Sequence, residues 1–193
     1  MTLINMREIV QTVFPDKGET EINLLLNNAY KDFCHESGIY RLSEDISIVG
    51  GAITYPLASC ATKAIDEVLS IVCKGTNGEP LANAPRFRID AGNLVFYSYS
   101  DEVLTTLPTD VTYVNITYKA IPTALTNADE PVFDVAYHEA LTVKVMQQLS
   151  ARIKDLQSAL YYSHEYDKML MRATKRANMR QNKTTSNIQP YYY

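Results

Sequence analysis

The sequence predicts an α+β fold that is mainly helical, with a bundle of N- and C-terminal helices and an inserted small antiparallel β subdomain. Apolar residues recur every three to four positions near both ends of the chain, as in amphipathic helices. Between about residues 41 and 125 the period changes to two, with turn signals between short runs. The 193 residues are 46% hydrophobic and 21% charged, as is usual for a folded protein. We therefore expect one domain over residues 1–177 and an extended C-terminal tail over 178–193.

Two helices are predicted over residues 5–38. Asn5 and Glu8 have the spacing of a capping box, which places the first helix start at Asn5. Pro15 and Gly18 interrupt the chain, and Gly38 suits the end of the second helix. The apolar faces comprise Ile9, Val10 and Val13 in the first helix and Ile22, Leu25, Leu26, Ala29, Tyr30 and Phe33 in the second.

The β insertion is predicted from short runs rich in β-branched and aromatic residues, at 46–49, 52–55, 68–72, 94–97 and 111–119. Gly50-Gly51, Asn77-Gly78 and Gly92-Asn93 are turn signals between them. The last run alternates, with Val114, Ile116 and Tyr118 on one face and Asn115 and Thr117 on the other. These features indicate a small antiparallel sheet or sandwich.

Two further helices are predicted over residues 131–177. Pro131 suits the first position of a helix, and a break is expected near Lys154-Asp155. The apolar stripes are Tyr137, Leu141, Val145, Leu149 and Ile153 before the break, and Leu156, Ala159, Leu160, Tyr166, Met169, Leu170 and Ala173 after it. From Asn178 onward the chain is polar and is expected to be extended.

No pattern in the sequence predicts catalysis, a cofactor or a metal site. His35, His138 and His164 show neither HxxxH nor CxxC-type spacing, and His138 is interpreted as a helix-surface residue. No serine stands in a G-x-S-x-G motif, and Gly50-Gly51 lacks the Walker lysine. Cys34 lies on the apolar face of its helix, where a buried thiol is the usual interpretation. We therefore expect a protein that is not an enzyme.

The end of the chain is basic. Residues 168–193 contain six Lys and Arg and no Asp or Glu, so a total of −4 leaves −10 on residues 1–167. The candidate docking residues are Arg172, Lys175, Arg176, Arg180, Lys183, Tyr191, Tyr192 and Tyr193. The first four share one face of a continuing helix. Three interpretations stay open: a solvated helix end, a surface that docks on an acidic partner protein, and contact with nucleic-acid phosphates.

The chain resembles the head-tail connector, or adaptor, family of tailed bacteriophages. The resemblance is carried by 28–41, where a helix ends in Phe33-Cys34 and Ser37, Ile39 and Tyr40 follow. Other segments that resemble the family are Ile53-Thr54-Tyr55-Pro56-Leu57, Gly92-Asn93-Leu94-Val95-Phe96 and Ile116-Thr117-Tyr118-Lys119-Ala120-Ile121-Pro122. Tyr40 stands where the family commonly has tryptophan, and the tyrosine-rich end is particular to this chain.

The resemblance implies a structural virion protein of the neck, assembled in the host cytoplasm. In that family many copies form a ring, dodecameric, beneath the portal protein. The ring extends the DNA channel, through which the genome passes without sequence-specific binding, and receives the next neck or tail protein. The segment from Lys168 would then dock on the portal. The alternative is a nucleic-acid-binding module that uses the basic C-terminal segment.

Overall fold

The computed structural model describes residues 1–47, 52–81, 85–98 and 102–184, except the side chains of Cys60 and of residues 180–184. The chain divides into two compact units, each described here by itself. The helical unit comprises Met1–Tyr40 and the chain from Pro122 onward, and the β unit comprises Arg41–Ile121. The predicted α+β class, mainly helical, is confirmed.

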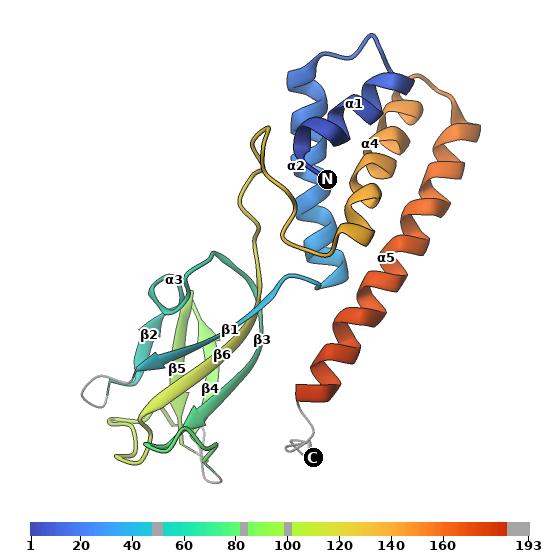
Figure 1. Ribbon diagram of the computed structural model, residues 1–193. Coiled ribbons are helices and arrows are strands. Elements are labelled where there is room, and N and C mark those ends of the chain that lie inside the picture. Colours follow the sequence, from blue (N-terminus) through green and yellow to red (C-terminus); the bar gives the residue numbers. More distant parts are fainter. Residues whose placement is uncertain (48–51, 82–84, 99–101, 185–193) are drawn as a thin grey trace. The chain divides into compact units, whose positions relative to one another are not determined.

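The helical unit contains α1 (Leu3–Val13), α2 (Glu19–Ser37), the short 3-10 helix η1 (Val135–Tyr137), α4 (His138–Arg152) and α5 (Leu156–Thr184). In this unit α5 runs alongside α4 and continues beyond it (Figure 1). Helix α2 ends at Gly38, which has a left-handed backbone (φ 58°) and whose N–H donates to the Cys34 carbonyl. The predicted end of the second helix is therefore confirmed.

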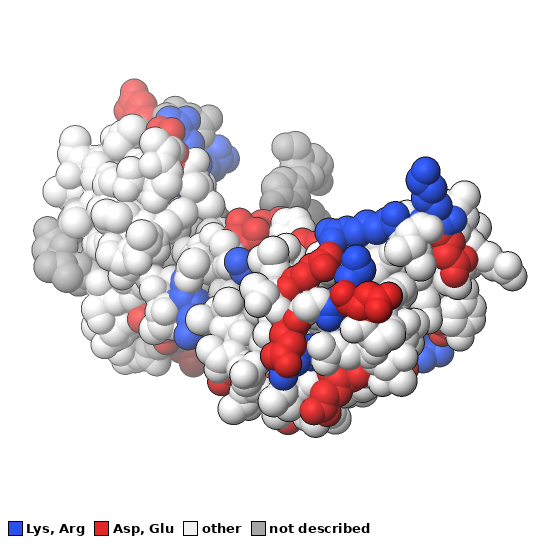
Figure 2. Space-filling model, turned by 90° about the horizontal axis from the view of Figure 1, so that it is seen from above, with Lys and Arg blue, Asp and Glu red and all other residues white. Residues whose placement is uncertain are grey.

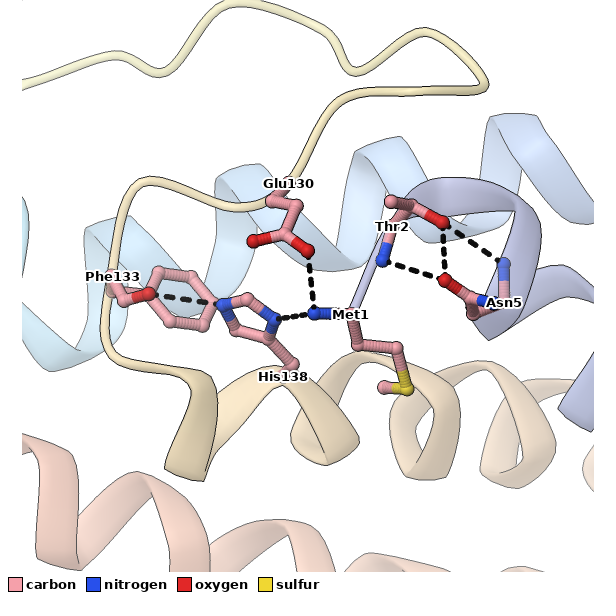
Figure 3. Close-up of polar contacts among 6 residues, drawn as sticks. All are labelled: Met1, Thr2, Asn5, Glu130, Phe133 and His138. Carbon is pink, nitrogen blue, oxygen red and sulfur yellow. Dashed lines mark hydrogen bonds and ion pairs between the residues drawn. The ribbon is translucent and has the colours of Figure 1, made fainter.

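Helix α1 begins earlier than the sequence predicts. Thr2 is the capping residue: its hydroxyl accepts from the Asn5 N–H, while the Asn5 side chain accepts from the Thr2 N–H (Figure 3). Thr2 therefore begins the capping box, and Asn5 is its other member at the third position of the helix. The helix starts earlier than expected because the Thr2 hydroxyl satisfies an N–H group left free in the first turn. The expected apolar face is also wrong in part, since Ile9 and Val13 are exposed and Leu3, Met6 and Val10 are buried.

The core of the helical unit joins all four long helices. Phe33 of α2 is completely buried, and its ring lies 5.0 Å from Phe133, 6.3 Å from Tyr137 and 6.1 Å from Tyr166. Tyr30 is also buried and its hydroxyl accepts from the Val132 N–H (3.0 Å). Burial raises the pKa of the Tyr30 hydroxyl well above its usual value, so this group stays neutral. Aromatic side chains from α2, α5 and the segment before α4 therefore hold the unit together.

Helix α4 starts at His138 rather than at Pro131. Asp134 accepts from the Ala136 N–H (3.0 Å) and starts η1, which leads directly into α4. The helical segment starts after Asp134 because its carboxylate accepts from an N–H group that is free at the helix end, and the fixed φ of Pro131 does not start it. His138 is buried, not a helix-surface residue. Its Nε2 lies 3.0 Å from the Phe133 carbonyl, and its Nδ1 lies 3.0 Å from the Met1 amino group, which also pairs with Glu130 (3.1 Å) (Figure 3).

The predicted break between the last two helices is confirmed. Lys154 has a left-handed backbone (φ 64°), and Asp155 accepts from the Ser158 N–H (3.1 Å) at the start of α5. Hydrogen bonds from the side chain and the backbone of Ser158 hold the pKa of the Asp155 carboxyl below its usual value. Helix α5 continues to Thr184, beyond Asn178, where the extended tail is expected. Asn178 to Thr184 contains neither proline nor glycine, so the sequence offers no strong helix breaker there.

The β unit contains two antiparallel sheets of three strands each. One has the order β1 (Arg41–Ser47), β6 (Tyr113–Ala120), β3 (Ile65–Lys74). The other has the order β2 (Thr54–Pro56), β5 (Asn93–Tyr97), β4 (Arg86–Asp90), and the short α3 (Leu57–Cys60) follows β2. The predicted faces of β6 are confirmed, because Val114, Ile116 and Tyr118 are buried while Asn115 and Thr117 are half-buried.

Most of the predicted strands are present, with shifted ends. The runs at 68–72, 94–97 and 111–119 correspond to β3, β5 and β6, and part of the run at 46–49 lies outside the described residues. Strand β4 is absent from the sequence prediction. It reads Arg-Phe-Arg-Ile-Asp, in which apolar and charged residues alternate as in a half-buried strand, but the run is short and holds only two apolar residues. All five residues are exposed in the structure.

Candidate docking surface on helix α5

One side of α5 packs against the rest of the helical unit. Tyr166, Ala173 and Ala177 are buried on this side, and Tyr166 donates to the Glu36 carboxylate of α2 (3.0 Å). Burial, with the nearby Glu36 charge, raises the pKa of the Tyr166 hydroxyl. Lys144 of α4 lies over the Tyr166 ring, 4.4 Å from its centre. The inner side of α5 is therefore fixed by α2 and α4.

The opposite side of α5 is exposed and carries large apolar residues. Leu156, Leu160 and Met171 are each about two-thirds exposed. Leu160 and Met171 are about three helical turns apart, so they lie on the same side. Sequence analysis places Leu156 and Leu160 on a buried stripe, and this expectation is wrong, because α5 packs through Tyr166 and the alanines instead. Ile153, at the end of the previous stripe, is exposed as well.

Basic residues lie beside this apolar row. Lys168, Arg172 and Lys175 are exposed, and Lys168 pairs with Glu165 (2.5 Å). Within the described part of the chain, neither Arg172 nor Lys175 makes an ion pair. We call the surface formed by Leu156, Leu160, Met171, Lys168, Arg172 and Lys175 the outer face of α5. Its apolar centre beside a charged row has the composition of a protein-binding surface.

Arg176 does not belong to the outer face. Its guanidinium donates to the Asp134 carboxylate (2.8 Å) and to the Tyr137 hydroxyl, and these contacts raise the pKa of Arg176. A polar hollow of about 370 Å³, lined by Ile39, Val132, Phe133, Asp134 and Arg176, adjoins the ion pair. Arg176 therefore ties α5 to the segment before α4 and is less available to a partner than Arg172 or Lys175.

The remaining candidate docking residues are only partly described. Arg180 and Lys183 lie in the last turns of α5, and the positions of their side chains are not described. Tyr191, Tyr192 and Tyr193 lie outside the described residues. The structure thus brings Arg172, Lys175 and Met171 onto one exposed surface. The apolar part of that surface was missed because a helical period predicts a face but does not say whether it is covered.

Charges elsewhere on the helical unit are mixed in sign. Arg7 pairs with Glu19 (2.9 Å) and Arg152 pairs with Glu21 (2.7 Å). On the face that Figure 2 shows, basic and acidic side chains of this unit lie next to one another. Mixed charge of this kind produces no strong field of one sign there. The acidic excess of residues 1–167 is therefore not gathered on this end of the unit.

Possible metal ligands and thiols are present among the described residues. The described residues contain no group of three or more His, Cys, Asp or Glu residues that could hold a metal ion. Burial raises the pKa of the Cys34 thiol to about 12 and that of Cys73 to about 11, so both thiols stay protonated near neutral pH. None of the described helices is long and apolar enough to cross a membrane.

Comparison with known proteins agrees with the architecture. A family model described as SU10 adaptor protein matches residues 1–189, almost the whole chain. No curated protein matches the sequence. The match confirms the resemblance inferred from the sequence, and the family is one of structural proteins rather than enzymes. With its helical unit, its two small sheets and a family match of this extent, the chain belongs to the SU10 adaptor proteins, a family of structural head-to-tail adaptors of phage virions.

Proposed function

We propose that this protein is an adaptor subunit that forms a dodecameric ring beneath the portal, extends the DNA channel and receives the next neck or tail protein. Family membership supports the adaptor role, and the outer face of α5 supports a docking role for the end of the chain. Arg172 and Lys175 would meet acidic side chains of the portal, while Leu160 and Met171 would pack against its apolar surface. Arg180, Lys183 and the three terminal tyrosines would extend this contact.

The net charge suits a passage for DNA. Residues 1–167 carry −10, and a wall of negative charge repels phosphate, which favours sliding over binding. The ring itself requires contacts between different surfaces of neighbouring copies, since only heterologous contacts can close a ring of many subunits. Each such contact can be modest because all copies contribute.

The test is the mass of the complex formed by the full chain with its cognate portal. Leu160→Asp and Lys175→Glu each alter the outer face of α5. Matched controls are Leu24→Asp and Lys31→Glu, which change an exposed leucine and an exposed lysine on α2. We expect the α5 variants to weaken association about tenfold, or about 1.4 kcal/mol, and the α2 variants to leave it unchanged. Equal losses from both sets would contradict docking through α5.

The alternative, a nucleic-acid-binding module, rests on the six basic residues of 168–193 without an acidic one. It makes a different prediction for the same variants. Binding to duplex DNA would fall steeply with salt, Lys175→Glu would weaken it, and Leu160→Asp would weaken it less. Salt-sensitive DNA binding together with no association with the portal would favour this alternative.

A further inference from the structure

Strand β4 lies exposed at the edge of its sheet. All five of its residues are exposed, including the apolar Phe87 (40%) and Ile89 (47%). β5 pairs with one side of β4, and no described strand pairs with the other. An exposed strand edge with apolar side chains readily pairs with a further strand unless something covers it.

The backbone of β4 offers hydrogen-bonding groups to this free edge. Ala91 (φ 46°) and Gly92 (φ 79°) form a two-residue turn of the I′ kind, which joins Asp90 and Asn93 as a hydrogen-bonded pair. Hydrogen-bonded and non-hydrogen-bonded pairs alternate along the ladder, so the backbone groups of Phe87 and Ile89 point away from β5. The Phe96 N–H agrees with this pattern, since it faces the other neighbour and donates to the Ile53 carbonyl (3.1 Å).

An apolar hollow adjoins the same edge. It measures about 660 Å³ and is lined by Ile89 of β4, Leu57 and Ala58 of α3, and Ile65 and Val68 of β3, among others. The hollow lies between edge strands of the two sheets, because β3 is the last strand of one and β4 the last of the other. An aromatic side chain placed beside Ile89 would fit into it.

We propose that β4 pairs antiparallel with β4 of a second copy of this chain, about a two-fold axis at Arg88. This register places Phe87 opposite Ile89 of the second copy, with the outward-pointing backbone groups of both residues facing each other. Residues directly opposite in a ladder share a face, so Phe87 enters the hollow beside the other copy's Ile89.

The charges of the strand are complementary in the same register. Arg86 lies opposite Asp90 of the second copy, and the two-fold axis repeats this pair. Arg88 lies opposite itself, which is a like-charge contact. Each Arg88 is already held within 3.5 Å of its own Asp90 and 4.3 Å from the centre of its own Tyr97 ring, and this offsets the repulsion.

This contact is separate from the contacts of a ring. It uses the same surface on both copies and therefore joins two chains only, so its presence or absence does not depend on the adaptor role. The pairing covers an edge that would otherwise promote aggregation. Since the strand is short, the buried surface is small and the dimer is expected only at high protein concentration.

Disulfide trapping of the full chain tests the register. In a Cys60→Ser background the remaining cysteines, Cys34 and Cys73, are buried. Arg88→Cys places two thiols opposite each other across the two-fold axis, at a separation that a disulfide can span. Arg86→Cys is the matched control, on the same strand and face but about 14 Å from its counterpart in the dimer.

We expect covalent dimer from Arg88→Cys under mild oxidation about tenfold or more faster than from Arg86→Cys. Adding Phe87→Asp should remove this difference, with circular dichroism showing that the variant remains folded. Equal trapping of both cysteine variants would mean random collision, and no trapping of either would mean no such pair. A dimer seen by light scattering that Arg88→Cys does not trap would place the contact elsewhere. Each of these three outcomes overturns the proposal.

Discussion

The helical unit and the β unit leave different kinds of surface exposed. The outer face of α5 exposes Leu156, Leu160 and Met171, but the backbone under them is satisfied by hydrogen bonds within the helix. Strand β4 exposes both side chains and backbone groups. A helix face can therefore bind only through side chains, whereas a strand edge can also extend its ladder. One chain thus offers two separate modes of recognition.

Phe33 of the helical unit and Phe87 of the β unit differ in how deeply they are buried. In the helical unit Phe33 is covered by Phe133 and Tyr137 from the segment before α4 and by Tyr166 from α5. In the β unit Phe87 lies at an edge, opposite the buried Phe96. Mutation of Phe33 should therefore lower stability more than mutation of Phe87, whereas mutation of Phe87 should affect the pairing of β4.

The largest expected effect is that of Phe33→Ala. Removing a fully buried ring loses its transfer free energy and leaves a cavity, and we expect the free energy of unfolding to fall by about 3–5 kcal/mol. Phe87→Ala is the matched change at the edge of the β unit and should cost about 1 kcal/mol or less. Urea unfolding followed by circular dichroism measures both. Similar losses would show that the burial of Phe33 and Phe87 does not differ as described.

A smaller effect is expected where α2 ends. Gly38 has φ 58°, so Gly38→Ala places a side chain in a left-handed conformation and should cost about 1 kcal/mol. Lys31→Ala is the control, because Lys31 is an exposed residue within the same helix, where alanine is a good helix former. Thermal unfolding should show a lower midpoint for Gly38→Ala only. A lower midpoint for both variants would show that the left-handed backbone of Gly38 is not the cause.

The smallest effect is expected from Glu44→Gln in the β unit. The Tyr118 hydroxyl (2.6 Å) and Thr62 donate to the Glu44 carboxylate and hold its pKa below the usual value. Because the folded pKa is lowered, this stabilisation is present above the unfolded pKa and is lost as the pH falls through the folded pKa. At pH 7 the loss should be about 0.5–1 kcal/mol.

The pH dependence provides the check on Glu44. The difference in unfolding free energy between the natural chain and Glu44→Gln should narrow as the pH is lowered through the acidic range, because a protonated Glu44 resembles glutamine. Glu79→Gln, at an exposed position without a described side-chain hydrogen bond, should show no such trend. A constant difference at all pH values would exclude the charge of Glu44 as the cause.

Local patterns predicted the elements that local interactions determine. Gly38, the break at Lys154-Asp155 and the alternation along β6 are all correct, because each depends on residues within one turn or one strand. The predicted starts of α1 and α4 are wrong, because several residues could cap each helix and the structure uses Thr2 and Asp134. The docking roles of Arg172, Lys175, Arg176, Arg180, Lys183 and Tyr191–Tyr193 stay a prediction.

The sequence by itself determined the class of the fold, the order of helical and β segments and the resemblance to phage adaptors, since periodicity and turn residues carry this information. Only the tertiary structure decided which apolar residues are covered. Tyr166, Ala173 and Ala177 turn toward α2 and α4, which leaves Leu156, Leu160 and Met171 exposed, and β4 is left at an edge. The reason is physical: a period describes one segment, whereas burial depends on the segment that packs against it.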